Sequence, residues 1–322
     1  MSGPLWFFGT PLFAAKVLEA LVRKGFPLTL AVTQPDRPAG RGYEVQTPPV
    51  KQLARDLTVS VFQPASLKEP SAREYLEGLA RVEPPEAAIA AAYGQILPAW
   101  LLQIPAKGFL NVHASLLPRW RGASPIEHAL WAGDAVTGAS IMRVVQKLDA
   151  GPVYGSRQIP LAPPLDAPAL EEALARAGGE LLAESLDAIL DGRIPATPQD
   201  ESRVAYAPKL RKEHGVLDWR RPAAELERQV RALRPWPGTF TQLRGKTLKV
   251  LRARVAEESG EPGEILKAQD AFTIACGAGS LVLEEVQLEG KKAMSAGDFL
   301  RGAQLEAGER LSLPEKPNPA PA

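Results

Sequence analysis

The residues of this chain that could do chemistry gather at the end of one short apolar segment. Residues 109–113 have the pattern of a buried strand, and strand alternation places the side chains of Asn111 and His113 on the same face of it. A carboxamide and an imidazole together can donate hydrogen bonds to a developing oxyanion, and the imidazole can also move a proton. A buried His–Asn pair with a purely structural role is the alternative interpretation.

Two segments farther along the chain could complete a site around His113. Residues 115–122 form a loop with many main-chain donors, and such a loop could bind a planar heterocycle. Asp149 follows the strand predicted over residues 138–145 and stands two residues before Gly151. An aspartate near a glycine usually forms a turn, but one close to His113 would orient the imidazole and stabilise its charge.

Other kinds of site have little support in the sequence. The chain has three histidines and one cysteine, so we expect no metal site and no disulfide. Cys276 lies in an apolar stretch and is expected to be a plain core thiol. The motifs G-x-G-x-x-G, G-x-x-x-x-G-K-[ST] and G-x-S-x-G are absent, which leaves dinucleotide binding, a phosphate loop and a serine hydrolase without a signature.

One loop is longer than a simple strand-to-helix connection requires. Residues 34–42 contain Arg37 and Arg41 among prolines and glycines. The loop is either a surface excursion or an arm that brings arginines to a phosphate backbone. Basic residues near 209–212, among them Lys209, could extend such a surface, although a solvated linker face explains them nearly as well.

The elements that must position these residues alternate along the first half of the chain. Apolar stretches separated by helical patterns predict a parallel sheet that is covered on both faces. We expect strands at residues 5–8, 28–33, 59–62, 87–93 and 109–113. We expect helices after Pro11, with Thr10 as N-cap, and near 50–56, 71–82 and 124–132. Because ligands bind beyond the carboxyl ends of such strands, His113 lies where an active site is expected.

The pattern changes after residue 190. A long helical pattern at 165–190 is followed by a polar stretch and a helix near 222–233. Short strands then follow at 240–243, 248–254, 263–266, 272–275 and 281–288, a spacing typical of a small β-barrel. We therefore predict a first domain at 1–192, a linker at 193–209, a β-barrel domain at 210–314 and a disordered tail at 315–322.

Composition limits the class of protein. The length of 322 residues suits two domains, and the hydrophobic fraction of 45% and charged fraction of 23% are globular values. A net charge of +1 excludes a nucleic-acid binder that relies on a large excess of positive charge. No apolar run approaches the roughly 20 residues of a membrane span and no signal peptide is evident, so we expect a cytoplasmic protein.

Together these segments resemble the methionyl-tRNA formyltransferases, a family of folate-dependent formyltransferases, over nearly the whole chain. Matching motifs are Asn-Val-His-Ala-Ser-Leu-Leu-Pro at 111–118, Leu-Asp at 148–149 and the arginine loop at 34–42. Arg-Pro-Trp-Pro at 234–237 and Gly-Lys-Lys-Ala-Met at 290–294 match in the second domain. Ala150 stands where the family usually has threonine, which removes a hydroxyl near the site.

The resemblance implies an α/β protein with a Rossmann-like formyltransferase domain and a small OB-like barrel that binds tRNA, acting as a monomer. It implies transfer of a formyl group from 10-formyltetrahydrofolate, a co-substrate, to the α-amino group of methionyl-initiator tRNA, without a metal. The implied catalytic residues are Asn111, His113 and Asp149. The implied folate-contacting loop is Ser115, Leu116, Leu117 and Pro118, and the implied tRNA contacts are Arg41, Arg37 and Lys209.

Two other functions remain open at this point. A formyltransferase for a small amine, such as a nucleotide sugar or glycinamide ribonucleotide, would keep Asn111, His113 and Asp149. It would need neither the arginine loop nor the mildly basic C-terminal third, since residues 204–322 contain 19 basic and 16 acidic residues. A non-catalytic RNA-binding protein that uses the barrel would leave the same three residues without a purpose.

Overall fold

The computed structural model describes residues 3–39, 44–162 and 165–312. The chain divides into two compact units. Unit 1 comprises Met1–Gly122, Val136–Pro160 and Glu171–Tyr206, and unit 2 comprises Ala123–Ala135, Leu161–Leu170 and Ala207–Ala322. The domain boundaries at 192 and 210 that the sequence suggests stay a prediction.

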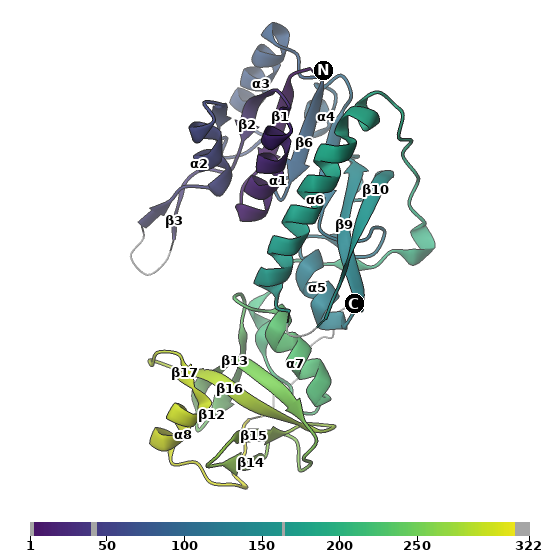
Figure 1. Cartoon of the computed structure of the whole chain (residues 1–322). Helices are drawn as coiled ribbons and strands as arrows, with labels where there is room; N and C mark the ends of the chain where they lie inside the picture. The colour runs from purple at the N-terminus through teal and green to yellow at the C-terminus, as the bar shows by residue number, and fades with distance from the viewer. Residues whose placement is uncertain (1–2, 40–43, 163–164, 313–322) are drawn as a thin grey trace. The chain divides into compact units, whose positions relative to one another are not determined.

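Unit 1 is built on one seven-stranded sheet with the strand order β10-β9-β7-β6-β1-β2-β5 (Figure 1). Its strands are β1 (Leu5–Gly9), β2 (Leu28–Val32), β5 (Ser60–Phe62), β6 (Ala87–Ala91), β7 (Phe109–His113), β9 (Val136–Arg143) and β10 (Val153–Pro160). The first five of these are mutually parallel, as predicted, whereas β9 runs antiparallel to β7 and β10 antiparallel to β9. The α/β class with a parallel sheet is therefore confirmed for this unit.

Helices cover both faces of this sheet. They are α1 (Leu12–Arg23), α2 (Pro49–Asp56), α3 (Pro70–Val82), α4 (Ala99–Leu102) and α6 (Ala167–Leu190). Leu76 of α3 and Leu101 of α4 pack with Trp6 and Phe8 of β1 in one buried cluster. On the opposite face, α6 and α1 lie in front of the strands in Figure 1.

The middle of α6 lies unusually close to the strands that hold the candidate site. A Cβ atom at Gly178 would lie 2.6 Å from Val112 Cγ1 and 3.1 Å from Ala139 Cβ. Because glycine has no Cβ atom, α6 can pack directly against β7 and β9 at this position. The strand that ends at His113 is thereby fixed from the helix side.

Four short elements are described in unit 1 besides these. They are β3 (Arg37–Ala39), β4 (Glu44–Gln46), β8 (Arg121–Gly122) and the 3-10 turn η1 (Glu201–Arg203). The long loop at 34–42 thus contributes one strand of an antiparallel β3–β4 pair, which the sequence pattern did not predict. Position 41 and the end of that loop lie outside the described residues.

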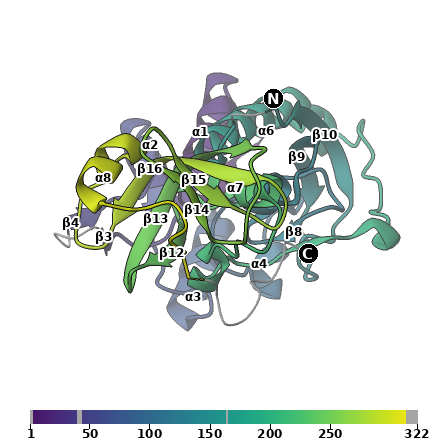
Figure 2. The same cartoon turned by 90° about the horizontal axis from the view of Figure 1, so that it is seen from below.

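Unit 2 contains a six-stranded antiparallel sheet. Figure 2 shows this sheet with helix α8 beside it. Its strands are β12 (Thr239–Leu243), β13 (Lys246–Ala256), β14 (Ile265–Ala268), β15 (Phe272–Ala275), β16 (Ser280–Leu288) and the short β17 (Met294–Ser295). Its helices are α5 (Pro125–Ala132), α7 (Ala223–Ala232) and α8 (Ala296–Ala303), with a 3-10 turn η2 (Lys212–Gly215), and β11 (Tyr206–Ala207) precedes η2 in the chain. The predicted run of short strands is confirmed.

Cys276 lies in the core of unit 2. Its side chain packs in the buried cluster that also contains Trp219, Phe272 and Ile274. Burial raises the pKa of its thiol to about 12. The interpretation as a plain core thiol is confirmed.

Candidate active site

Three loops at the carboxyl edge of the unit 1 sheet are tied together. The Thr10 hydroxyl, after β1, donates to the main-chain oxygen of Tyr93 at 3.1 Å. The Gln34 amide, after β2, donates to the same oxygen at 2.9 Å. Thr10 was expected to cap α1, but Pro11 occupies the N-cap without a side-chain hydrogen bond, because the Thr10 hydroxyl is engaged across the sheet edge.

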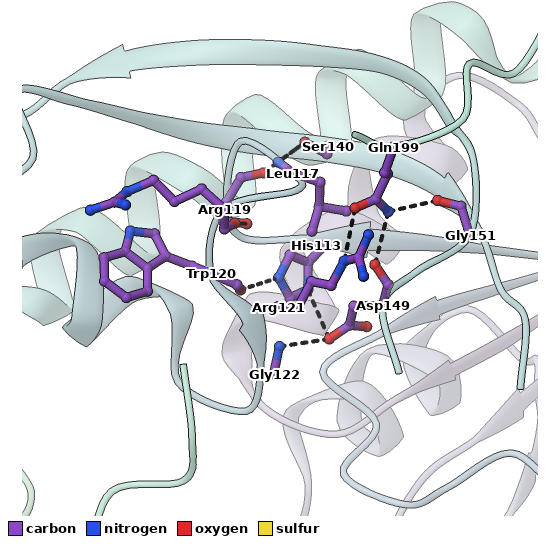
Figure 3. Close-up of polar contacts among 11 residues, drawn as sticks. His113, Leu117, Arg119, Trp120, Arg121, Gly122, Ser140, Asp149, Gly151 and Gln199 are labelled. Atoms are coloured by element: carbon purple, nitrogen blue, oxygen red, sulfur yellow. Dashed lines mark hydrogen bonds and ion pairs between the residues drawn. The ribbon is translucent and has the colours of Figure 1, made fainter. Parts of the chain in front are cut away.

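His113 ends β7 with its ring held between two oxygen atoms (Figure 3). Its Nε2 lies 2.8 Å from the main-chain oxygen of Trp120, a donor–acceptor distance at which Nε2–H donates. Its Nδ1 lies 3.9 Å from Asp149 Oδ2, an ion pair when the imidazole is protonated. The side chains of His113 and Asp149 are 7% and 14% exposed, so the charge of the carboxylate acts on the imidazole with little screening.

Asp149 reaches this position through its main chain. Its φ of 46° lies in the left-handed region, and its Oδ2 accepts a hydrogen bond from Gly122 N–H at 2.8 Å. The structure therefore brings together His113 and Asp149, which are 36 residues apart in the sequence numbering. Asp149 therefore lies close enough to His113 to orient the imidazole, which a residue that only forms a turn would not do.

Asn111 precedes His113 by two residues on the same strand and is half-exposed. Within the described part of the chain its carboxamide makes no hydrogen bond. A carboxamide that the protein leaves unsatisfied is free to donate to a bound molecule. The role of Asn111, like those of His113 and Asp149, stays a prediction.

The loop after β7 is held by its own polar groups. The buried Ser115 donates from Oγ to the main-chain oxygen of Arg119 at 2.6 Å. Ser140 Oγ, from β9, donates to the Ser115 oxygen at 2.7 Å and accepts from Leu117 N–H at 3.2 Å. At least one main-chain N–H that was expected to be available to a ligand, that of Leu117, is thus bonded within the protein. Leu116, Leu117 and Pro118 are half-buried.

Several groups that hold the site escaped the sequence analysis. The Trp120 carbonyl and the Gly122 N–H are main-chain atoms, which leave no signature in residue type. Ser140 did carry a signal, since it is a polar residue in the middle of an apolar strand. A buried hydroxyl in such a position must find partners, and here its partners shape the loop after β7.

The basic residues proposed to bind nucleic acid lie in different segments of the chain. Arg37 begins β3 and is exposed, and Lys209 is exposed after β11. Arg41 lies outside the described residues. The start of the loop is fixed, because the Asp36 carboxylate accepts from Lys51 Nζ at 2.6 Å and from Gln63 Nε2 at 2.8 Å.

Two further properties concern the described residues as a whole. No group of three or more His, Cys, Asp and Glu side chains among them is arranged to hold a metal ion. None of the helices in the same part of the chain combines the length and the apolar composition needed to cross a membrane.

Comparisons with known proteins identify the family. Residues 5–186 match the model of the formyl transferase family, and residues 209–304 match that of the formyl transferase C-terminal domain. A methionyl-tRNA formyltransferase of Geobacter sulfurreducens is 44% identical over 306 residues, which cover 95% of each chain. The chain belongs to the methionyl-tRNA formyltransferase family. Another member, from Myxococcus xanthus, is 46% identical over 312 residues, covering 96% of this chain and 98% of that one.

Solved structures share the fold of this formyltransferase. HypX from Aquifex aeolicus in complex with tetrahydrofolic acid superposes with a TM-score of 0.62 at 19% identity, and the match covers 98% of this chain and 51% of that chain. The chain thus spans about half the length of HypX. WlaRD, a sugar 3N-formyl transferase, superposes with a TM-score of 0.65 at 13% identity over 91% of this chain and 100% of that one.

Proposed function

We propose that this formyltransferase moves the formyl group of 10-formyltetrahydrofolate to the α-amino group of methionyl-initiator tRNA, for translation initiation. The observation that carries the proposal is the 3.9 Å approach of Asp149 to His113, which shares its strand with Asn111. It is made in a chain whose relative over 95% of its length is named methionyl-tRNA formyltransferase. The folate carries the activated carbon, so the chain's own residues need only bind, orient and move a proton.

The geometry supports a division of labour among these three residues. As the amine adds to the formyl carbon, negative charge builds on the formyl oxygen, and the unengaged Asn111 carboxamide can donate to it. A donor in such a position contributes about 3 kcal/mol to the transition state. The amine must lose a proton and the folate nitrogen must gain one, and we propose that the His113 imidazole passes this proton. Asp149 acts through the imidazole, whose positive charge it stabilises.

We further propose that the folate binds against the loop of Ser115, Leu116, Leu117 and Pro118. The half-buried side chains of Leu116 to Pro118 offer apolar surface, while the Ser115–Ser140 hydrogen bonds keep the loop in one shape before substrate arrives. A loop ordered in advance binds at a lower cost in entropy. We propose that the missing hydroxyl at Ala150 affects this neighbourhood only.

The tRNA is proposed to bind through the arm that carries Arg41 and Arg37, through Lys209 in the linker at 193–209, and through the domain at 210–314. The antiparallel sheet of unit 2 supports an OB-like architecture for that domain, a fold that binds nucleic acids. We propose a monomer that works in the cytoplasm, where charged tRNA is used.

A formyl-transfer assay tests this proposal. The purified protein and 10-formyltetrahydrofolate are incubated in parallel with methionyl-initiator tRNA, uncharged initiator tRNA, a nucleotide-linked amino sugar and glycinamide ribonucleotide. The proposal expects formylation of the charged tRNA alone. Formylation of a small amine with no reaction on the tRNA would assign the chain to the small-amine class, and tRNA binding without any transfer would make it a binding protein.

A further inference from the structure

Gln199 joins the segment after the transferase region to the loop that presents Asp149. It lies between the two family-matched regions, which end at residue 186 and resume at 209. Its Nε2 donates to the main-chain oxygen of Asp149 at 2.8 Å and to that of Gly151 at 2.7 Å. Figure 3 shows the Gln199 side chain reaching this loop beside His113.

A second set of contacts fixes the orientation of the Gln199 amide. Its Oε1 accepts from Arg121 Nε at 3.0 Å, and Arg121 Nη2 donates to Glu201 Oε1 at 2.8 Å. Glu201 Oε2 also accepts from Lys147 Nζ at 2.7 Å. The Arg121 side chain is fully buried and has only donors, so the amide must turn its oxygen to the guanidinium and its NH₂ to the two carbonyls.

The Asp149 loop depends on such support. The left-handed φ of 46° at Asp149 is a conformation that persists only where the surroundings hold it. Leu148, just before it, is 63% exposed and adds little packing. A shift of this main chain would move the carboxylate away from His113 Nδ1, which lies 3.9 Å from it.

We propose that Gln199 is a positioning residue for formyl transfer: its amide clamps the main chain on both sides of Ala150 so that the Asp149 carboxylate stays beside the imidazole of His113. This inference rests on the proposed function, since Gln199 acts through Asp149, to whose main-chain oxygen it donates. The segment between the two matched regions then belongs to the active site in addition to connecting them.

The test begins with Gln199→Met, which keeps the length of the side chain and removes both donors. The expected result is a fall in kcat of between about tenfold and a hundredfold, the range that a displacement of about 1 Å reaches. KM for the charged tRNA and for the formyl donor should stay within about threefold. The matched control is Gln229→Met, because Gln229 Nε2 likewise donates to two carbonyls, those of His214 at 2.7 Å and Val216 at 3.1 Å, within unit 2.

A double-mutant cycle separates positioning from general loss of structure. In an Asp149→Asn background, Gln199→Met should lower kcat by less than about twofold further, because the group through which it acts is already gone. A merely structural defect would lower kcat by the same factor in both backgrounds, and that result would overturn the inference. Gln199→Glu is the second variant, in case Gln199→Met does not fold, since it keeps an acceptor for Arg121 and removes the donors to Asp149 and Gly151.

The outcomes distinguish this inference from the proposed function. If Asp149→Asn retains wild-type kcat on methionyl-initiator tRNA, the role of Asp149 in the proposed function is wrong. If Asp149→Asn is nearly as damaging as Asp149→Ala while Gln199→Met and Gln199→Glu both match the wild type, only the positioning role is wrong. Both variants are assayed at a temperature below the melting temperature of each. If Gln229→Met then loses as much kcat as Gln199→Met, the positioning role of Gln199 is also refuted.

Discussion

At the scale of single residues, the candidate chemistry depends on the position of the His113 imidazole relative to the Asp149 carboxylate. Strand alternation was enough to predict that Asn111 and His113 share a face, because a period of two follows from backbone geometry. The approach of Asp149 could not be predicted in the same way. It depends on a left-handed backbone conformation and on hydrogen bonds from Gly122 and Gln199, and residue types and spacing do not report such contacts.

The imidazole itself is the first residue to test. His113→Ala should lower kcat at least about a hundredfold, with the dissociation constant of the formyl donor within a few-fold of wild type, because the lost group acts mainly in the transition state. Steady-state kinetics with the charged tRNA and equilibrium folate binding give the two quantities. A turnover within a few-fold of the wild type would remove His113 from the mechanism.

At the scale of elements, buried strands were easier to predict than exposed ones. The strands β1 and β6 have no polar side chain, and β2 and β7 are apolar except for Thr29 in β2 and for Asn111 and His113 in β7. Such apolar strands are what a parallel sheet buried on both faces requires. β10 is half-exposed along its length and includes Arg157 and Gln158, so its sequence lacks that signal. The β3–β4 pair was missed because each of its strands has only three residues and β3 contains the strand-breaking Pro38.

The contact between β9 and the loop after β7 gives a prediction for Ser140. Ser140→Ala leaves the Ser115 carbonyl and the Leu117 N–H without their partner, which should cost about 1–3 kcal/mol of unfolding free energy. KM for the formyl donor should rise several-fold while kcat changes less. Urea unfolding and steady-state kinetics measure both effects.

Ser156→Ala is the matched control for this prediction. Ser156 is exposed and shares a hydrogen bond of 2.8 Å with Ser140 Oγ, so its loss removes only the outer contact. A Ser140→Ala variant as stable as Ser156→Ala, with an unchanged KM, would mean that the loop keeps its shape without the hydroxyl.

The ion pairs of Glu201 predict a pH dependence. Hydrogen bonds from Arg121, and then from Lys147, lower the pKa of Glu201 from 4.5 to about 2. Because the folded-state pKa is lowered, the stabilisation is fully present above about pH 4.5 and is lost as the pH falls toward 2. The difference in Tm between wild type and Glu201→Gln should therefore be constant from pH 7 to 5 and shrink below that. A difference that grows on acidification would contradict this assignment.

At the scale of the whole molecule, the arginine loop and Lys209 belong to different units, so their contributions to tRNA binding must be measured separately. Arg41→Ala should impair kcat/KM on charged initiator tRNA far more than folate binding, while Arg37→Ala and Lys209→Ala should have smaller effects. Each phosphate contact removed should reduce the slope of log affinity against log salt by about 0.7–0.9.

Discrimination between tRNAs tells whether Arg41 does more than attract phosphate. If kcat/KM of Arg41→Ala falls more on initiator than on elongator methionyl-tRNA, the side chain reads a feature of the initiator. If kcat/KM of Arg41→Ala equals that of the wild type on both tRNAs, the loop does not contribute to tRNA binding, and the second domain alone must hold the tRNA.

The buried thiol of Cys276 can report local opening of unit 2 through its rate of chemical labelling. It is the only cysteine of the chain, its residue is 3% exposed, and its pKa of about 12 keeps the thiolate scarce in the native state. A maleimide can therefore react only during local opening of the unit 2 core, and the labelling rate measures the free energy of that opening. Because His113→Ala leaves this core untouched, its labelling rate should equal that of the wild type, even where formylation has ceased.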